Sequence, residues 1–158
     1  MKDSVGKYYN VNLPDKYKNC MGRTQVTESL IAQILTMHFH YGMTLGEVEE
    51  WLKAMGLNFA HSTVMNWIEN SADILEPLDK PLQKEITTNS DVHGDETTVK
   101  GKDKRLAFMS VFANIRNYKL DPVKYLCDVF RRIKNTADDK LVELLAHKWQ
   151  PSTVSEWV

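Results

Sequence analysis

Helical spacing of the apolar residues, interrupted by helix-capping residues, constrains the first half of the chain more than any other feature. Thr27 opens a run whose apolar residues fall on one helix face, and Gly42 ends that run. Thr44 and Glu47 form a capping box before a second run, which Gly56 ends. These signals predict two successive helices, the second about three turns long.

A third apolar run begins after residues 61–63, which offer a helix cap, and it reaches Pro81. The length of the run predicts a long helix. We expect this helix to bend near Glu76 and Pro77, because proline removes a hydrogen bond from the helical ladder.

Three more helices are predicted in the second half of the chain. The first ends at Asn117, and its apolar residues recur every third position: Leu106, Met109, Phe112 and Ile115. Asp121 and Pro122 supply an N-cap and a proline at the first helical position, so a helix with an apolar stripe follows them. A short helix is expected over residues 138–146.

Two segments lack helical spacing. Residues 1–23 show no sustained apolar period and are expected to form a flexible leader. Residues 89–99 contain β-branched residues but too few apolar ones for a buried helix, which predicts one short β-strand or hairpin fragment before a turn at 100–104. The predicted fold class is therefore mainly α, a helical bundle with one short strand or hairpin fragment.

Charge is unevenly distributed along the chain, although the formal net charge is only -1. Acids outnumber bases over residues 47–91, and bases outnumber acids over residues 100–134. Cys20 and Cys127 lack the spacing of a zinc or redox motif, so we expect free thiols in a reducing cytoplasm. No apolar run reaches the roughly 20 residues of a membrane span and none has signal-peptide form, so we expect a cytoplasmic protein without a membrane partner.

Residues 44–68 place two capped helices around a turn at 56–58, the order found in a helix-turn-helix that binds DNA. The side chains that would reach phosphates or base edges from the second helix are His61, Ser62, Thr63, Asn66 and Asn70. The alternative is an ordinary helical hairpin. Glu47, Glu49 and Glu50 favour that alternative, because carboxylates repel phosphate.

A basic stretch offers a second candidate DNA-binding surface. Its first residues are Lys100, Lys102, Lys104 and Arg105. Lysines and arginines can neutralise DNA phosphates, but a solvated helix face has the same composition. The sequence leaves both interpretations open.

An acidic motif, His-Gly-Asp-Glu-Thr, occupies residues 93–97. Magnesium prefers hard oxygen ligands, and a pair of such ions held by several carboxylates can activate water or a hydroxyl for attack on a phosphodiester. Asp95 could be one ligand of such a site. Taken alone the motif is more typical of a solvated turn than of a metal site.

Two groups of segments resemble transposases of the insertion sequence 66 family, in the same order along the chain. The first group consists of residues 64–68, 72–78 and 92–97, and the second of residues 120–133, 141–145 and 149–151. The acidic motif departs from the family's His-Ala-Asp-Glu-Thr only at Gly94. The N-terminal half is also similar to transposases of the insertion sequence 6 type, but the C-terminal segments favour the first family.

The resemblance implies an RNase H-like core, in which an Asp-Asp-Glu triad binds divalent metal, magnesium in this family, and cuts and joins DNA. Asp95 corresponds to the first aspartate, and so to a catalytic residue and a metal ligand. Between residue 99 and the C-terminal match there is no room for the strands that carry the other two acids, which suggests an internal deletion. Asp121 and Asp128 are interpreted as a helix cap and a helix-surface residue. We therefore expect no functionally bound metal.

The expected organisation is a leader over 1–23, a helical segment with the helix-turn-helix-like hairpin over 24–88, a remnant of the first catalytic strand over 89–105, C-terminal helices over 106–150 and a tail over 151–158. The expected function is that of a catalytically inactive, transposase-derived protein of DNA transposition. The alternatives are a DNA-binding module that acts at transposon ends or with an intact transposase, and a helical protein without nucleic-acid function. Self-association through apolar faces left by the absent core is a further expectation.

Overall fold

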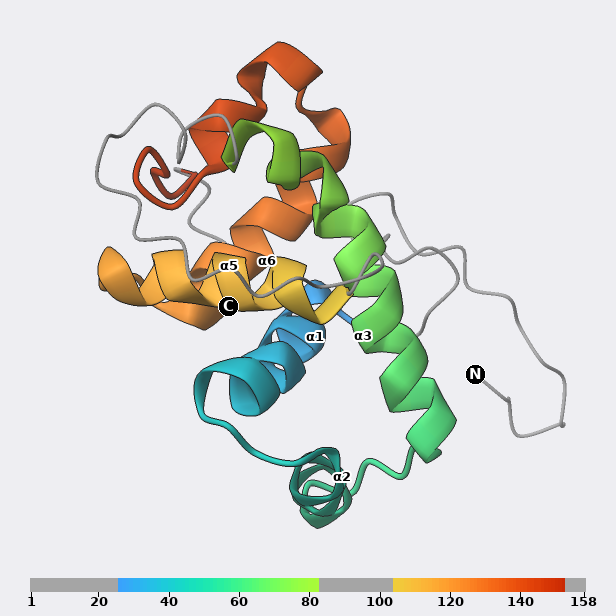
Figure 1. The fold of residues 1–158 in the computed structure, drawn as a ribbon. Helices are drawn as coiled ribbons and strands as arrows, with labels where there is room; N and C mark the ends of the chain where they lie inside the picture. The colour runs from blue at the N-terminus through green and yellow to red at the C-terminus, as the bar shows by residue number, and fades with distance from the viewer. Residues whose placement is uncertain (1–25, 83–103, 153–158) are drawn as a thin grey trace, which may run out of the picture.

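The computed structural model of the chain describes residues 26–82 and 104–152 (Figure 1). The first part contains α1 (Glu28–Leu35), the π-helical turn η2 (Thr36–His40), α2 (Leu45–Ala54), α3 (His61–Leu75) and the 3-10 turn η3 (Glu76–Leu78). The second part contains α5 (Lys104–Asn117), α6 (Pro122–Arg132) and the 3-10 turns η4 (Ile133–Asn135) and η5 (Asp138–Leu144). These two parts contain helices and no strand, so the mainly α class is confirmed, whereas the leader and the strand predicted over 89–99 lie outside the described residues.

Several helix starts follow directly from the capping residues. The Leu30 N–H donates to Thr27 Oγ1 at 3.4 Å, which caps α1. The Lys124 N–H donates to Asp121 Oδ1 at 3.0 Å, which caps α6 in front of Pro122. Both caps confirm the sequence prediction, because a side-chain oxygen at this position satisfies an N–H that the helix leaves unpaired.

The start and the end of α3 differ in how well they were predicted. The cap expected at residues 61–63 is wrong, because the helix already begins at His61 and its N-cap, Ala60, makes no side-chain bond. The Ala60 carbonyl accepts the N–H groups of Thr63 and Val64 at 2.9 and 3.3 Å, so these residues belong to the first turn. The bend expected near Glu76 is confirmed, since α3 tightens there into η3.

The first helix does not run evenly to Gly42 as its apolar spacing suggested. Its last turn, η2, is a π-helix, in which the Tyr41 N–H donates to the Thr36 carbonyl at 3.1 Å. Gly42 then has a φ of 73°, a left-handed conformation that suits glycine. The wider turn shifts the side chains that follow around the helix axis relative to a regular α-helix.

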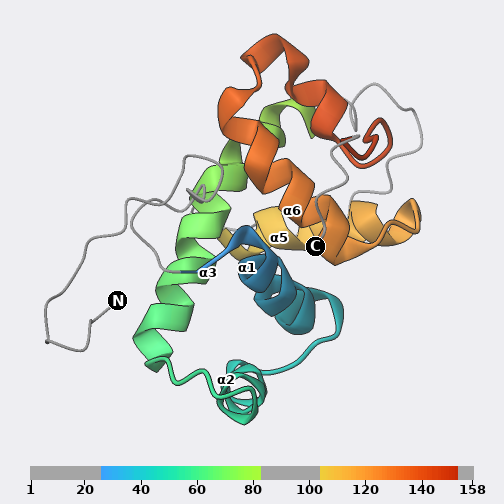
Figure 2. The same cartoon turned by 180° about the vertical axis from the view of Figure 1, so that it is seen from behind.

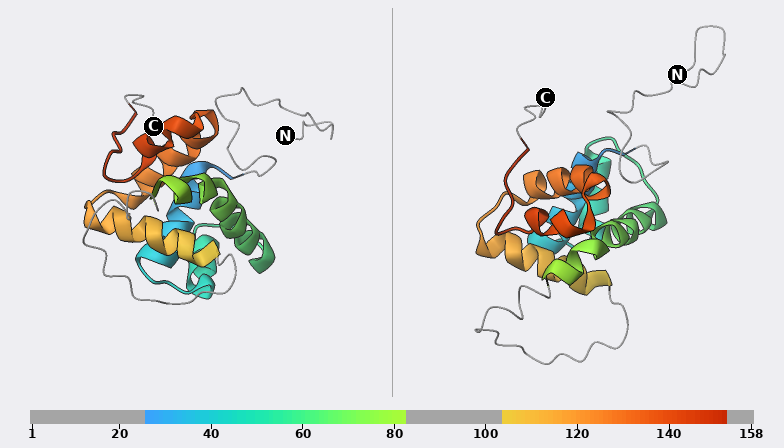
Figure 3. Two further views of the ribbon diagram at one scale, coloured as in Figure 1. Left: turned by 45° about the horizontal axis from the view of Figure 1, so that its top comes forward. Right: turned by 90° about the horizontal axis from the view of Figure 1, so that it is seen from above.

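The two described parts share one hydrophobic core. Helix α1 packs along α6, and α5 packs against α3, η2 and α6. The views in Figures 1, 2 and 3 agree that α5 and α6 lie against the helices of the first part. Phe39 of η2 stacks on Phe108 and Phe112 of α5, with ring centroids 4.6 and 5.9 Å apart.

The buried face of α5 differs from the face that the sequence suggested. Its buried side chains are Phe108, Val111, Phe112 and Ile115. Met109, which was expected in the apolar stripe, is 61% exposed. The expectation was wrong because a strict three-residue spacing drifts around a helix of 3.6 residues per turn, and only alternating steps of three and four keep to one face.

Few large apolar side chains remain exposed in the described parts: Tyr41, Met55, Met109 and Tyr118. The helices on either side of residues 83–103 therefore cover one another's apolar faces. Self-association through faces left open by an absent core stays a prediction. None of the described helices is long and apolar enough to cross a membrane.

The contrast between two neighbouring residues tests this packing. Phe108→Ala removes a fully buried ring and should lower the free energy of unfolding by about 3–5 kcal/mol. Met109→Ala, on the exposed side of the same helix turn, should change it by less than about 0.5 kcal/mol. Urea unfolding followed by circular dichroism measures both values, and equal losses would contradict the assigned face.

Candidate nucleic-acid interface

Helices α2 and α3 form the hairpin that was predicted as a helix-turn-helix. The Thr44 N–H donates to Glu47 Oε2 at 2.7 Å and the Glu47 N–H donates to Thr44 Oγ1 at 3.3 Å, which completes the capping box. The backbone hydrogen bond from Thr44, reinforced by its hydroxyl, lowers the pKa of Glu47. Gly56, with a φ of 80°, ends α2 in the left-handed conformation. Figure 1 views α2 nearly along its axis and α3 across the page, so the two helices cross steeply.

The connection between the two helices is longer than in a standard helix-turn-helix. Six residues, 55–60, separate α2 from α3, whereas the motif has a turn of about 3–4 residues. Phe59 packs its ring edge-on against Trp67, at a centroid distance of 4.7 Å. The connection is therefore held against α3 by an aromatic contact.

A polar contact also joins the two helices at the start of α3. His61 Nδ1 and Glu49 Oε1 lie 2.5 Å apart, and the Glu49 side chain is only 17% exposed. When the imidazole is protonated this contact is an ion pair. His61 is thus engaged with α2, and its Nδ1 is directed toward a carboxylate.

The remaining candidate residues of α3 lie along its exposed side. Ser62, Asn66 and Asn70 are exposed and follow one another at intervals of four residues, so they share one face of the helix, while Thr63 is half-buried. Glu69 is also exposed next to this face. A surface that offers hydroxyl and amide groups beside a carboxylate can hydrogen-bond to base edges, but it gains little from phosphate attraction.

Formal charge separates the two described parts of the molecule. Residues 26–82 carry eight carboxylates against two lysines, and residues 104–152 carry ten lysines and arginines against five carboxylates. The α2–α3 hairpin belongs to the acidic part. Because duplex DNA binds chiefly through its phosphates, the basic part is the electrostatically favoured surface for it.

Only two of the four basic residues predicted to bind DNA before and at the start of α5 lie in the described part of the chain. Lys104 and Arg105 form the beginning of α5, at its N-terminal end. Lys100 and Lys102 lie outside the described residues, as does Asp95 with the rest of the acidic motif. Their proposed roles in DNA and metal binding stay predictions.

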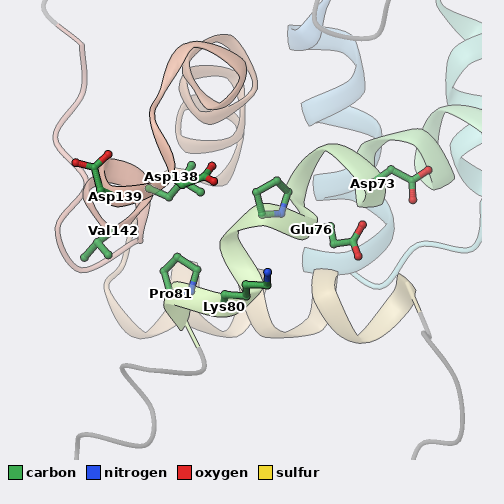
Figure 4. Close-up of a pocket in the computed structure, with 9 residues that line it drawn as sticks. Asp73, Glu76, Lys80, Pro81, Asp138, Asp139 and Val142 are labelled. Atoms are coloured by element: carbon green, nitrogen blue, oxygen red, sulfur yellow. The ribbon is translucent and has the colours of Figure 1, made fainter.

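Acidic side chains line a pocket of about 590 Å³ between the end of α3 and η5. Figure 4 shows Asp73 and Glu76 on one side of η3, and Asp138 and Asp139 on the other. The carboxylates therefore do not converge on one point. Consistently, the described residues contain no group of three or more His, Cys, Asp or Glu side chains that could hold a metal ion.

A buried carboxylate fixes the last described residues of the chain against α6. Asp128, only 3% exposed, accepts hydrogen bonds from Trp149 Nε1 at 2.7 Å, Ser152 Oγ at 2.7 Å and Arg132 Nη1 at 2.9 Å. Tyr125, one turn before it, packs edge-on against Trp149. The interpretation of Asp128 as a helix-surface residue was wrong, because the chain returns after η5 and covers it.

The hydrogen bonds around Asp128 also set its ionisation. Burial alone would raise the pKa of this carboxyl group, but the three donors stabilise the charged form and hold the pKa below its ordinary value. The sequence offered one clue, the spacing of four residues between Asp128 and Arg132, which suits an ion pair on a helix. It could not show that Trp149 and Ser152 return to the same carboxylate.

A charge-neutral substitution tests this role of Asp128. Asp128→Asn should lower the free energy of unfolding at pH 7 by about 3 kcal/mol, because it removes the charge that pairs with Arg132 and presents an amide to other donors. The folded-state pKa is depressed, so this contribution is present above the unfolded pKa and is lost as pH falls through the folded pKa. The loss measured by urea unfolding should therefore shrink below about pH 4.

Asp121→Asn is the matched control on the same helix. Asparagine caps helices nearly as well as aspartate, so this variant should lose only a few tenths of a kcal/mol. If Asp128→Asn loses no more stability than the control, the hydrogen bonds to Asp128 do not hold the C-terminal residues on α6 as described.

Comparison with known proteins gives one family. A family model described as Transposase IS66 family matches residues 23–144, whereas no curated protein and no solved structure matches the chain. The matched residues extend from the start of α1 to η5 and include the capped hairpin, the acidic motif and α6. They make up more than half of the 158 residues. The resemblance noted in the sequence is thereby confirmed, and the chain belongs to the insertion sequence 66 transposase family.

Proposed function

We propose that this transposase-derived chain does not catalyse strand transfer and acts by binding duplex DNA through its basic C-terminal part. The charge separation between residues 26–82 and 104–152 is the observation that carries the proposal. Family membership implies contact with DNA. A surface with twice as many cations as carboxylates is suited to neutralise phosphates.

The assignment of the acids supports catalytic inactivity. A divalent metal serves strand transfer in transposases of this type, and two or more carboxylates must hold it. Asp121 already caps α6, and Asp128 already binds three donors of its own domain. Glu143 lies on the exposed side of η5. We therefore assign none of these three residues as a partner of Asp95, and the described residues do not fit a metal site of this kind.

The basic part presents its cations on the surface. The exposed lysines and arginines over residues 107–152 are Arg116, Lys119, Lys124, Arg131, Lys134, Lys140 and Lys148. Arg116 and Lys119 lie together at the turn from α5 to α6. Such a surface binds duplex DNA with little sequence preference and with strong dependence on salt.

The α2–α3 hairpin is the second candidate for DNA contact. The observation in its favour is the common exposed face of Ser62, Asn66 and Asn70. In a helix-turn-helix this face would lie in the major groove and read bases. Because this face lies among carboxylates, which repel phosphate, we expect it to contribute to the selectivity of DNA binding more than to its affinity.

The proposed inactivity can be tested directly. Purified protein should not cleave or join DNA that carries the transposon ends, in magnesium or in manganese, and Asp95→Ala should give the same result as the unchanged chain. Gel analysis of labelled DNA ends measures both. Metal-dependent cleavage that Asp95→Ala abolishes would overturn the proposed inactivity.

The proposed DNA binding is tested by its dependence on salt. The affinity for duplex DNA should fall steeply with added salt, and the double variant Arg116→Gln, Lys119→Gln should weaken binding and reduce the slope against log salt by about 2. The double variant Lys53→Gln, Lys80→Gln, which makes the same charge change in the acidic part, should alter neither quantity. Fluorescence anisotropy at several salt concentrations gives these values.

The hairpin is tested in the same experiment. The triple variant Ser62→Ala, Asn66→Ala, Asn70→Ala should leave the salt slope unchanged and reduce only a preference for transposon-end sequences. A stronger effect on affinity than that of the Arg116 and Lys119 variant would favour the hairpin as the main surface. Negligible affinity at low salt for all proteins would favour a helical protein without nucleic-acid function.

A further inference from the structure

A second pocket, of about 570 Å³, lies between η2 and α5 and shares no lining residue with the acidic one. Its lining consists of His38, Phe39, Met109, Ala113, Arg116 and Asn117. These residues supply one cation, one imidazole and one amide around apolar groups, and none of the six is acidic. The volume is in the range of sites that bind small organic ligands.

The apolar side of this pocket is held rigidly. Phe39 stacks on Phe108 and Phe112, and those two rings are fully buried. The π-helical turn η2 presents Phe39 to α5. Single π-helical turns occur frequently at functional sites, where they re-aim side chains.

The polar side has defined hydrogen-bonding capacity. His38 Nδ1 lies 2.7 Å from the Met43 carbonyl oxygen, which can only accept, so Nδ1 carries the proton and donates. In the neutral ring Nε2 is then an acceptor. Arg116 contributes a permanent cation at the end of α5, and Asn117 contributes an amide that can donate and accept.

We infer that this pocket receives an unpaired nucleotide at the end of a DNA strand, with the base against the apolar side and its phosphate at Arg116. The inference rests on the proposed DNA-binding function and names the part of the DNA that the basic surface would select. A nucleotide matches the lining because it joins a flat ring with polar edges to an anionic group. The acidic pocket beside η5 would repel the same ligand.

The position of the pocket agrees with this occupant. Arg116 lines the pocket and also belongs to the exposed basic turn with Lys119, so a DNA backbone that binds the turn ends near the pocket. An uncharged apolar peptide would leave the guanidinium of Arg116 without a partner. Charge complementarity therefore favours the nucleotide.

The test compares a blunt duplex with the same duplex that carries a short unpaired overhang containing 2-aminopurine. The unchanged protein should bind the overhang DNA at least about fivefold more tightly, the lower value expected for stacking of one base. The fluorescence of 2-aminopurine should change on binding. Anisotropy and fluorescence titrations at low salt measure both effects.

Ala113→Leu fills the pocket without changing charge and should abolish the overhang preference and the fluorescence change while leaving the affinity for blunt duplex unaltered. Ala54→Leu, the same change at an exposed helical alanine of α2, should behave as the unchanged protein. Leucine is nearly as favourable as alanine in a helix, so both variants should fold. Circular dichroism confirms that they do.

The outcomes separate this inference from the proposed function. Equal binding of both DNAs, or an overhang preference that survives Ala113→Leu, overturns the inference while salt-dependent duplex binding still supports the proposed function. Binding of overhang DNA alone supports the inference and contradicts a duplex-binding role. Failure of both DNAs to bind at low salt overturns both.

Discussion

The stacking of Phe39 on Phe108 and Phe112 joins the two described parts of the molecule, and much of the structure depends on it. The residues on the two sides of this contact are separated by roughly half the chain. Their rings bury apolar surface, and the aromatic contacts add about 0.5–1.5 kcal/mol beyond that burial. The contact requires the π-helical turn η2, because a regular turn would direct Phe39 to another position. A local irregularity in one helix thus permits the long-range packing of the whole bundle.

This packing brings an acidic and a basic segment of the chain together in one fold. In a flexible chain, an acidic and a basic segment would take many relative positions. Here the acidic hairpin α2–α3 and the basic helices α5 and α6 belong to one core, so their relative positions are fixed. The formal net charge of -1 therefore hides two segments of opposite charge. The absence of acids from the lining of the η2–α5 pocket follows from the same arrangement.

Features that depend on neighbouring residues could be predicted from the sequence, and features that depend on distant contacts could not. The caps at Thr27, Thr44 and Asp121 are local hydrogen bonds between residues three apart, and they were predicted. The buried face of α5 was misjudged at Met109, because a strict three-residue spacing was followed. Phe108, Val111, Phe112 and Ile115 have the helical spacing of three and four, so the correct face could have been predicted from the sequence. Ser62, Asn66 and Asn70 of α3 lie on one exposed face, in agreement with helical spacing. The contact of His61 with Glu49, in contrast, depends on the crossing of two helices.

Asp128 shows how a residue that carries a family resemblance can serve the fold and not the reaction. It lies in a segment that resembles the family's C-terminal end, and in a protein with an acid-dependent reaction such a carboxylate invites a catalytic interpretation. Its oxygens instead accept bonds from Trp149, Ser152 and Arg132, so little capacity remains for a metal ion. This carboxylate orders the C-terminal residues of the described chain on α6. Folding alone therefore constrains this residue, because replacing it would leave Trp149, Ser152 and Arg132 without their common acceptor.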